Sequence, residues 1–371
     1  MIRVMVVDDS ALVRKIASDV LSSDPEIVVA ATASTAEIAI ARLDRERPDV
    51  ITLDLQMPGM GGLEAIRRIM SLRPTPIVVM SAHAKKGADL TIQALEAGAV
   101  DFVLKPSSSL SGGIPAIARE LTEKVRDAAR IVVGLQGDTD IAPETAAFTP
   151  YPAALAAAPT VSPAAPACAC EAENCDLVAI GTSTGGPVAL KTVLSRLPKD
   201  FPVGVVVVQH MPPVFTKAFA ERLDACCDVR VKEAENGDPI LPARVLIAPG
   251  NWHMTVSRLG GEPRVLLNQE DTINGHRPSV DALMRSVARE YGPRACGVIM
   301  TGMGRDGADG LHELRARGGR VIAQDKGTSV IYGMNKEVIQ NGDAHEVAPV
   351  DQIASRLRDY VCGRAAARNA V

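Results

Sequence analysis

Short hydrophobic runs alternate with longer segments of mixed polarity over the first 130 residues. Four of the runs end at an acidic, hydroxyl or basic residue: 2–7, 50–53, 77–80 and 102–104. Runs of this length are typical of buried strands, and the segments between them have the length and polarity of helices. Strands that alternate with helices predict a parallel sheet, whose strand ends meet on the side where ligands bind.

The same alternation returns after about residue 175. Strands are predicted at 177–181, 203–208, 296–301 and 320–323, and helices at 186–196, 214–224, 279–290, 307–317 and 350–361. Shorter β-type segments are predicted near 229–233, 244–248 and 263–268. This order predicts a second α/β domain, with a mainly parallel sheet flanked by helices and a β-hairpin insertion in its middle.

The segment between the two regions lacks such a pattern. It is rich in Ala, Pro, Thr and Ser, so it offers little surface to bury and cannot hold a packed core. With 371 residues and 47% hydrophobic content, the chain can bury two cores. We therefore predict one domain at 1–130, a linker at 131–174 and a second domain at 175–365.

Charge and composition argue against several classes of function. The net charge of −4 and the pI near 5.9 give no indication of a basic surface, so nucleic-acid binding is not expected. No apolar stretch reaches the roughly 18 residues of a membrane span, and the first residues are not typical of a signal peptide. We expect a cytoplasmic protein without membrane insertion, whose seven cysteines are free thiols.

Three acidic residues stand where predicted strands of the first domain end: Asp8, Asp9 and Asp54. Crowded carboxylates repel one another and need counter-charges; Mg²⁺ suits oxygen ligands, and Lys105 supplies a second cation. Between these cations Asp54 is suited to accept a phosphoryl group as the nucleophile. The alternative, that each acid only caps the following helix, accounts for one such residue better than for the whole set.

This arrangement resembles the receiver domain of two-component response regulators over about residues 1–125. The resemblance implies a flavodoxin-like fold, Mg²⁺ held by the three acids, phosphorylation of Asp54 and a histidine kinase as phosphodonor. Ser81 matches the switch hydroxyl, Phe102 the switch aromatic residue and Lys105 the lysine of the family. A receiver indicates that the chain is regulated, but not which activity is regulated.

The chemistry of the second domain begins at Gly181-Thr182-Ser183-Thr184-Gly185-Gly186. A serine between glycines after a strand fits a tight turn that exposes its hydroxyl beside the free N–H groups of a helix start. The motif alone is weak, because a glycine turn with a serine helix cap looks the same. It is not a nucleotide-binding loop of the G-x-x-x-x-G-K-[ST] type, since the lysine is missing.

Two further strand ends carry the partners that a serine nucleophile needs. His210 leaves the strand at 203–208 as a candidate general base, and Asp306, beyond the strand at 296–301, is placed to orient its imidazole. Three such residues at parallel strand ends favour a catalytic triad over three separate structural roles. Their order in the chain differs from that of α/β-hydrolases. His276 is the rival base and is expected more as a wall of the site.

Four segments of this domain resemble the catalytic domain of the chemotaxis protein-glutamate methylesterases: 180–186, 209–213, 248–250 and 301–307. The resemblance implies that Ser183, His210 and Asp306 form the triad. It also implies that the substrates are γ-methyl glutamate esters, and sometimes glutamines, on chemoreceptors. Thr182 departs slightly from the family pattern, which often has alanine there.

Acyl transfer on such a triad needs hydrogen-bond donors for the oxyanion. We expect these from the backbone at Thr184, Gly185 and Gly186, together with the loop of Met303, and we expect no metal in this half of the chain. Two other functions remain open. A phosphorylation-gated anion-binding module explains the glycines but leaves His210 without a role, and a general serine esterase or peptidase differs only in substrate.

Overall fold

The computed structural model describes residues 1–82, 85–105, 113–131, 175–258 and 260–362, and it divides into two compact units. After the families that their sequences resemble, the unit described over residues 1–131 is called the receiver unit and the unit described over residues 175–362 the catalytic unit. Each is described here by itself. The predicted linker at 131–174 lies outside the described residues except for Ile131.

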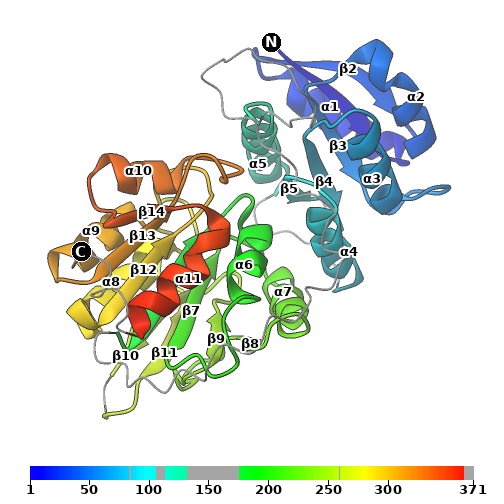
Figure 1. The fold of residues 1–371 in the computed structure, drawn as a ribbon. Helices are drawn as coiled ribbons and strands as arrows, with labels where there is room; N and C mark the ends of the chain where they lie inside the picture. The colour runs from blue at the N-terminus through cyan, green and yellow to red at the C-terminus, as the bar shows by residue number, and fades with distance from the viewer. Residues whose placement is uncertain (83–84, 106–112, 132–174, 259, 363–371) are drawn as a thin grey trace, which may run out of the picture. The chain divides into compact units, whose positions relative to one another are not determined.

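The receiver unit is a five-stranded parallel sheet in the order β2-β1-β3-β4-β5, with helices on both faces (Figure 1). Its elements, in chain order, are β1 (Ile2–Val7), α1 (Ala11–Ser22), β2 (Ile27–Ala33), α2 (Ala36–Glu46), β3 (Val50–Asp54), α3 (Gly62–Leu72), β4 (Ile77–Ser81), α4 (Lys85–Glu96), β5 (Asp101–Leu104) and α5 (Gly113–Ala128). This confirms the predicted flavodoxin-like architecture.

Local chemistry explains where these elements begin and why the central strands are so apolar. Every residue of β3 and β4 is buried, because helices cover both faces of a parallel sheet. The side chain of Ser10 accepts a hydrogen bond from the N–H of Val13 at the start of α1, and Thr35 caps α2 at Ile38 in the same way. The strands therefore hold the core while the caps fix the loops beside the strand ends.

The catalytic unit is a seven-stranded parallel sheet in the order β14-β13-β12-β6-β7-β9-β8, with a separate antiparallel hairpin, β10-β11 (Figure 1). Its elements are β6 (Leu177–Thr182), α6 (Gly186–Leu194), β7 (Gly204–Gln209), α7 (Phe215–Asp224), β8 (Arg230–Glu233), β9 (Arg244–Ile247), β10 (His253–Ser257), β11 (Arg264–Asn268), α8 (Val280–Glu290), a 3-10 turn (Gly292–Arg294), β12 (Ala295–Ile299), α9 (Ala308–Ala316), β13 (Arg320–Gln324), α10 (Met334–Gln340), β14 (Glu346–Ala348) and α11 (Val350–Val361).

The mainly parallel sheet and the hairpin were both predicted, but the segments were partly misplaced. The β-type segments near 229–233 and 244–248 are β8 and β9, which extend the parallel sheet and do not form the hairpin. The hairpin instead joins β11 to β10, a strand that the pattern did not predict. The short elements α10 and β14 were also missed.

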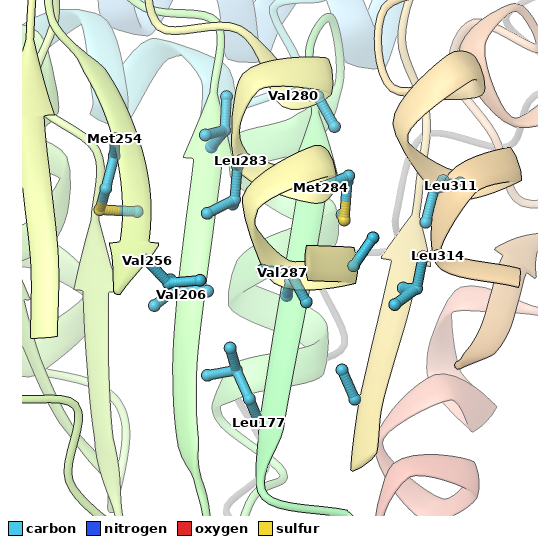
Figure 2. Close-up of a cluster of buried hydrophobic side chains, with 14 of the residues drawn as sticks. Leu177, Val206, Met254, Val256, Val280, Leu283, Met284, Val287, Leu311 and Leu314 are labelled. Atoms are coloured by element: carbon cyan, nitrogen blue, oxygen red, sulfur yellow. The ribbon is translucent and has the colours of Figure 1, made fainter. Parts of the chain in front are cut away.

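The core of the catalytic unit gathers around α8, whose apolar face lies on the sheet (Figure 2). Four of its side chains are fully buried: Val280, Leu283, Met284 and Val287. They pack with Leu311 and Leu314 of α9, and with strand residues that include Leu177 and Val206. Full burial of one such side chain stabilises a fold by about 1.5–3 kcal/mol, so α8 is anchored firmly.

Two further expectations concern membranes and thiols. Among the described residues, no helix combines the length and apolar character needed to cross a bilayer. Cys175, Cys226, Cys227 and Cys296 are free. Cys362, just beyond α11, is disulfide-bonded, so the expectation of seven free thiols is wrong for this residue.

Candidate phosphorylation and catalytic sites

The acidic cluster of the receiver unit forms as predicted. Asp54 ends β3, Asp8 and Asp9 follow β1, and carboxylate oxygens of the three residues lie within 4.8 Å of one another. The Nζ atom of Lys105 lies 2.7 Å from Oδ2 of Asp8 and 2.7 Å from Oδ2 of Asp54. Asp54 is 3% exposed. Its carboxylate is thus held beside the ammonium group of Lys105 and the carboxylates of Asp8 and Asp9.

The electrostatics of the cluster favour a bound cation. Burial raises the pKa of Asp8 despite the hydrogen bond and charge of Lys105, and the charge of Asp54 adds to the rise. The pKa of Lys105 is lowered by burial, but its contacts with Asp54 and Asp8 outweigh this and raise it overall. Three carboxylates around one ammonium group leave negative charge uncompensated. Such an oxygen donor set fits Mg²⁺.

The two switch residues lie in neighbouring strands of the same unit. Ser81 ends β4, is buried, and accepts a hydrogen bond of 2.7 Å from the hydroxyl of Thr91 in α4. Phe102 is buried in β5, and the ammonium group of Lys124 lies 5.1 Å from the centre of its ring. Thr91 therefore links Ser81 directly to α4. The sequence analysis did not predict this contact.

In the catalytic unit, Ser183 stands in the turn between β6 and α6, as predicted. Its N–H donates to the carbonyl oxygen of Thr301 at 3.0 Å, beyond the end of β12, and its own carbonyl accepts from the N–H of Gly186 at 2.8 Å. Gly185 has φ +79°, in the left-handed region that glycine adopts without strain, and a Cβ atom there would lie 2.5 Å from Val330. The turn therefore needs glycine and leaves Ser183 half-buried.

His210 and Asp306 meet as the sequence analysis predicted. Nε2 of His210 lies 2.8 Å from Oδ2 of Asp306, and both side chains are nearly fully buried. Nδ1 of His210 is buried too and has no hydrogen-bond partner among the described residues. Because Asp306 occupies Nε2, Nδ1 is the ring nitrogen left to exchange a proton. Ser183 Oγ makes no hydrogen bond to His210 in this structure.

The carboxylate of Asp306 lies against the N-terminus of α8. It accepts hydrogen bonds from the backbone N–H of Val280 at 2.7 Å, from the hydroxyl of Ser279 at 2.8 Å and from the side-chain amide of Asn274 at 3.1 Å. Burial alone would raise the pKa of Asp306, but His210, the N–H of Val280 and the hydroxyl of Ser279 outweigh it and hold the pKa well below its usual range. A helix N-terminus favours the anion further. Asp306 is therefore a fixed negative charge.

A second buried carboxylate, Asp281, stands beside Asp306. The amide nitrogen of Asn274 donates to both, at 2.8 Å to Asp281 and 3.1 Å to Asp306. Burial raises the pKa of Asp281, and the negative charge of Asp306 adds to that rise. Asn274 has φ +53°, which asparagine tolerates better than most residues. These residues were not singled out from the sequence, because nothing local indicates that this loop reaches the acid.

His276 stacks on the proposed base. The ring centres of His210 and His276 are 3.9 Å apart, and the planes differ by 10°. The neighbouring Arg277 donates from Nε and Nη2 to Oδ1 of Asn251 and from Nη1 to two carbonyls at the end of the hairpin. Since Asp306 holds His210, the geometry favours His210 as the base and leaves His276 as a wall of the site.

The loop that follows His210 is held by close backbone packing. A Cβ atom at Gly250 would lie 2.2 Å from the nitrogen of Pro213, and the N–H of Gly250 donates to the hydroxyl of Thr216 at 3.0 Å. This contact explains the glycine of the Ala248-Pro249-Gly250 motif. The backbone that carries His210 is therefore braced by the turn after β9.

The expected oxyanion donors are only partly available. The N–H of Gly186 already donates to Ser183, so it cannot serve in this conformation. The carbonyl of Thr184 accepts from the hydroxyl of Thr301 at 2.9 Å, which fixes the turn. Met303 is 40% exposed and follows Gly302, where a Cβ atom would lie 2.7 Å from Cβ of Ser183. The Met303 loop therefore lies directly beside the nucleophile.

Comparisons with known proteins agree with this arrangement. Residues 4–111 match the response regulator receiver domain, and residues 178–357 match the CheB methylesterase domain. The chain is 46% identical to protein-glutamate methylesterase/protein-glutamine glutaminase 2 of Xanthomonas campestris, over 95% of this chain and 99% of that protein. It is 44% identical to the protein of the same name from Koribacter versatilis, over 96% of this chain and 95% of the other.

A solved structure supports the second half of the comparison. The crystal structure of the Thermotoga maritima CheB methylesterase catalytic domain matches with a TM-score of 0.50 and 44% identity, over 50% of this chain and 99% of that chain. The fold and the two sites together define a response-regulator hydrolase. Within that class, the chain belongs to the protein-glutamate methylesterase/protein-glutamine glutaminase family.

Proposed function

We propose that the chain is a phosphorylation-regulated serine hydrolase that demethylates γ-glutamyl methyl esters on chemoreceptors and deamidates glutamines on them, as part of chemotaxis adaptation. The observation that carries the proposal is the buried His210–Asp306 pair beside Ser183, which is half-buried on a strand-to-helix turn. The names and activities of the relatives supply the substrate class.

Ester cleavage on this site begins with attack by Ser183 Oγ on the side-chain carbonyl carbon. Nδ1 of His210 takes the hydroxyl proton as the C–O bond forms, and Asp306 holds Nε2–H and stabilises the imidazolium. A movement of the Ser183 or His210 side chain must bring Oγ to Nδ1, because the two are not hydrogen-bonded here. Catalytic hydrogen bonds often tighten only once substrate is bound.

Collapse of the tetrahedral intermediate gives an acyl-enzyme and methanol. The imidazolium returns its proton to the leaving methoxide oxygen, and the new ester joins Ser183 to the glutamyl side chain. Water then attacks the same carbonyl, with His210 again as base, and releases glutamate and free Ser183. A glutamine follows the same path and loses ammonia, so one site serves both reactions.

The oxyanion of these intermediates needs donors from the turn and from the neighbouring loop. We assign this role to the N–H groups of Gly185 and Met303, which are engaged by no acceptor among the described residues. Thr184 remains a candidate as predicted. Gly186 instead supports the turn through its bond to Ser183.

Regulation is assigned to the receiver unit, with Asp54 as the phosphorylation site and a histidine kinase as phosphodonor. Asp8, Asp9 and Asp54 would hold Mg²⁺, and Lys105 lies where it can neutralise charge on the phosphoryl oxygens. The bound ion supplies charge neutralisation for phosphoryl transfer. Ser81 and Phe102 are assigned as the residues that respond. We place the enzyme in the cytoplasm, in line with the proposed kinase partner, and assign no cofactor to ester hydrolysis.

The proposal is tested by methanol release from methylated chemoreceptor, with wild type compared with Ser183→Ala. Loss of the nucleophile should lower the rate by at least about a thousandfold. Ser195→Ala is the matched control, because Ser195 is an exposed serine at the other end of α6. Turnover by Ser183→Ala within about tenfold of wild type would remove Ser183 from this role. Labelling by a fluorophosphonate in wild type alone would exclude a non-catalytic anion-binding module.

A further inference from the structure

Thr182 and Gln209 are the last residues of the neighbouring strands β6 and β7, and they face each other in the sheet. Each directly precedes a residue of the proposed triad, Ser183 or His210. Their side chains are buried, with exposures of 0% and 2%. Residues that face each other across two strands point to the same side of the sheet, so their side chains can interact directly.

Every hydrogen-bond donor of the two side chains is used. The hydroxyl of Thr182 donates to Oε1 of Gln209 at 2.7 Å. Nε2 of Gln209 donates to the carbonyl oxygen of Ser183 at 3.0 Å and to that of His210 at 3.1 Å. The amide nitrogen supplies two donors, which matches the two carbonyls. If the amide were turned over, its oxygen would face both carbonyl oxygens.

Packing restricts the amide as well. A Cβ atom at Gly186 would lie 1.9 Å from Oε1 of Gln209 and 2.8 Å from Oγ1 of Thr182. The amide is therefore pressed against the start of α6, on the same turn that carries Ser183. The backbone adds one more link between the strands, since the N–H of His210 donates to the carbonyl of Thr182 at 3.1 Å.

We propose that Thr182 and Gln209 are positioning residues for the reaction, with the hydroxyl of Thr182 orienting the amide of Gln209. The oriented amide joins the backbone of the nucleophile to the backbone of the base and so fixes the distance over which the proton moves. The inference rests on the proposed function, because it concerns proton transfer from Ser183 to His210. Both side chains are buried and so have no surface for a substrate to contact, and we expect the effect to fall on kcat.

Thr182→Val and Thr182→Ser separate the hydroxyl from the methyl group. Valine keeps the volume and removes the hydroxyl, whereas serine keeps the hydroxyl and removes the methyl group. In the full chain, we expect Thr182→Val to lower kcat for methanol release about tenfold, with KM within about twofold, because misplaced reacting groups slow the chemical step. Thr182→Ser should stay within about threefold of wild-type kcat. The rate of labelling of Ser183 by diisopropyl fluorophosphate should follow kcat.

A wild-type kcat for Thr182→Val would overturn the inference. Equal losses in the valine and serine variants would do so too, because the effect would then come from lost packing. Gln209→Glu keeps the size but replaces both donors by acceptors, and we expect a loss of about a hundredfold in kcat from the unpaired buried groups. A wild-type rate for this variant would also contradict the proposal.

Failure of this inference can be told apart from failure of the proposed function. If Ser183→Ala is inactive and Thr182→Val has wild-type kcat, the hydrolase assignment stands and the positioning role is wrong. If Ser183→Ala still releases methanol, the hydrolase assignment itself is wrong. Melting temperatures of all variants show whether each one is folded under the assay conditions.

Discussion

The two candidate sites lie at the same kind of position, the carboxyl ends of parallel strands, but they are assembled differently. In the receiver unit, Asp54 and Ser81 end strands, and Asp8 and Lys105 follow strands directly. The ionic contacts of 2.7 Å are made by these residues themselves. In the catalytic unit, Asp306 comes after a turn beyond β12, and its carboxylate is held by donors from the start of α8 and from a separate loop.

This difference teaches which parts of a site depend on topology and which depend on loops. Parallel strands place their carboxyl ends at the same edge of the sheet, whatever the sequence of the loops that connect them. Residues at these strand ends therefore lie close together. Donors such as Asn274 are placed by a loop conformation that only the folded chain defines. We expect substitutions at strand ends to abolish function, and substitutions in the supporting loops to weaken it by degrees.

The largest effect is expected at the base. His210→Gln should lower the rate of methanol release by at least about a thousandfold, because no other group then takes the proton of Ser183. His276→Gln removes only the stacked ring and should cost about tenfold or less. His312→Gln, on an exposed side chain, serves as the control. If His276→Gln were the more damaging change, the base would have been assigned to the wrong ring.

Phosphorylation of Asp54 comes next in the expected size of effect. Wild type should incorporate phosphate from acetyl phosphate in a Mg²⁺-dependent reaction, and its hydrolase activity should rise with incorporation. Asp54→Asn should do neither, because the amide is not a nucleophile for phosphoryl transfer. Asp44→Asn, on a highly exposed carboxylate, is the matched control. Stoichiometric phosphate on the Asp54→Asn protein would place the acceptor elsewhere, with Asp8 or Asp9 examined first.

A smaller effect is expected in the supporting loop. Asn274→Ala removes the donor shared by Asp306 and Asp281, which leaves Asp281 with an unpaired oxygen close to a second negative charge. A lost hydrogen bond to a charged group corresponds to about a tenfold fall in kcat. Asn341→Ala, at the exposed end of α10, is the control. An unchanged kcat would show that the remaining donors suffice to hold Asp306.

The smallest expected effect is on the pH dependence of stability. Because the pKa of Asp306 is lowered in the folded state, its ionised form stabilises the fold above the ordinary aspartate pKa of about 4. That contribution is lost as the pH falls below this value towards the folded-state pKa. Trp252, the single tryptophan, reports unfolding of the catalytic unit. Urea titrations from pH 6 to pH 3 should show a steeper loss of stability in wild type than in Asp306→Asn; equal slopes would contradict this.

Much of the fold could be predicted because its central strands are continuous apolar runs. Where a strand is short, at an edge or half-exposed, the pattern fails. The strand β14 has three residues, and β10 is buried at only three of its five positions. The helix α10 has seven residues, and the residue before it, Gly333, has no side chain to cap it, so its beginning carries no sequence signal.

For the catalytic site, the residues after strand ends were predicted and their supporting residues were not. Ser183 and His210 follow directly on strands, and their residue types indicate their chemistry. Asn274 lies 32 positions before Asp306, in a loop whose path the sequence does not reveal. The sequence shows Gln209 as an amide residue directly after the apolar run 203–208. Its role depends on the register of β6 against β7, which places it opposite Thr182, and the hydrophobic pattern of the sequence does not define that register.

The position of Val280 couples three parts of the catalytic unit that lie far apart in the sequence. Its side chain belongs to the core around α8 (Figure 2), and a Cβ atom at either Gly181 or Gly307 would come within 2.6 Å of its Cγ1. Gly181 lies in the strand before Ser183, and Gly307 follows Asp306. Among relatives, an alanine at 181 should therefore occur together with a smaller residue at 280. Position 307 should stay glycine whatever stands at 280, because its φ of +97° strains other residues, although neither glycine takes part in the chemistry.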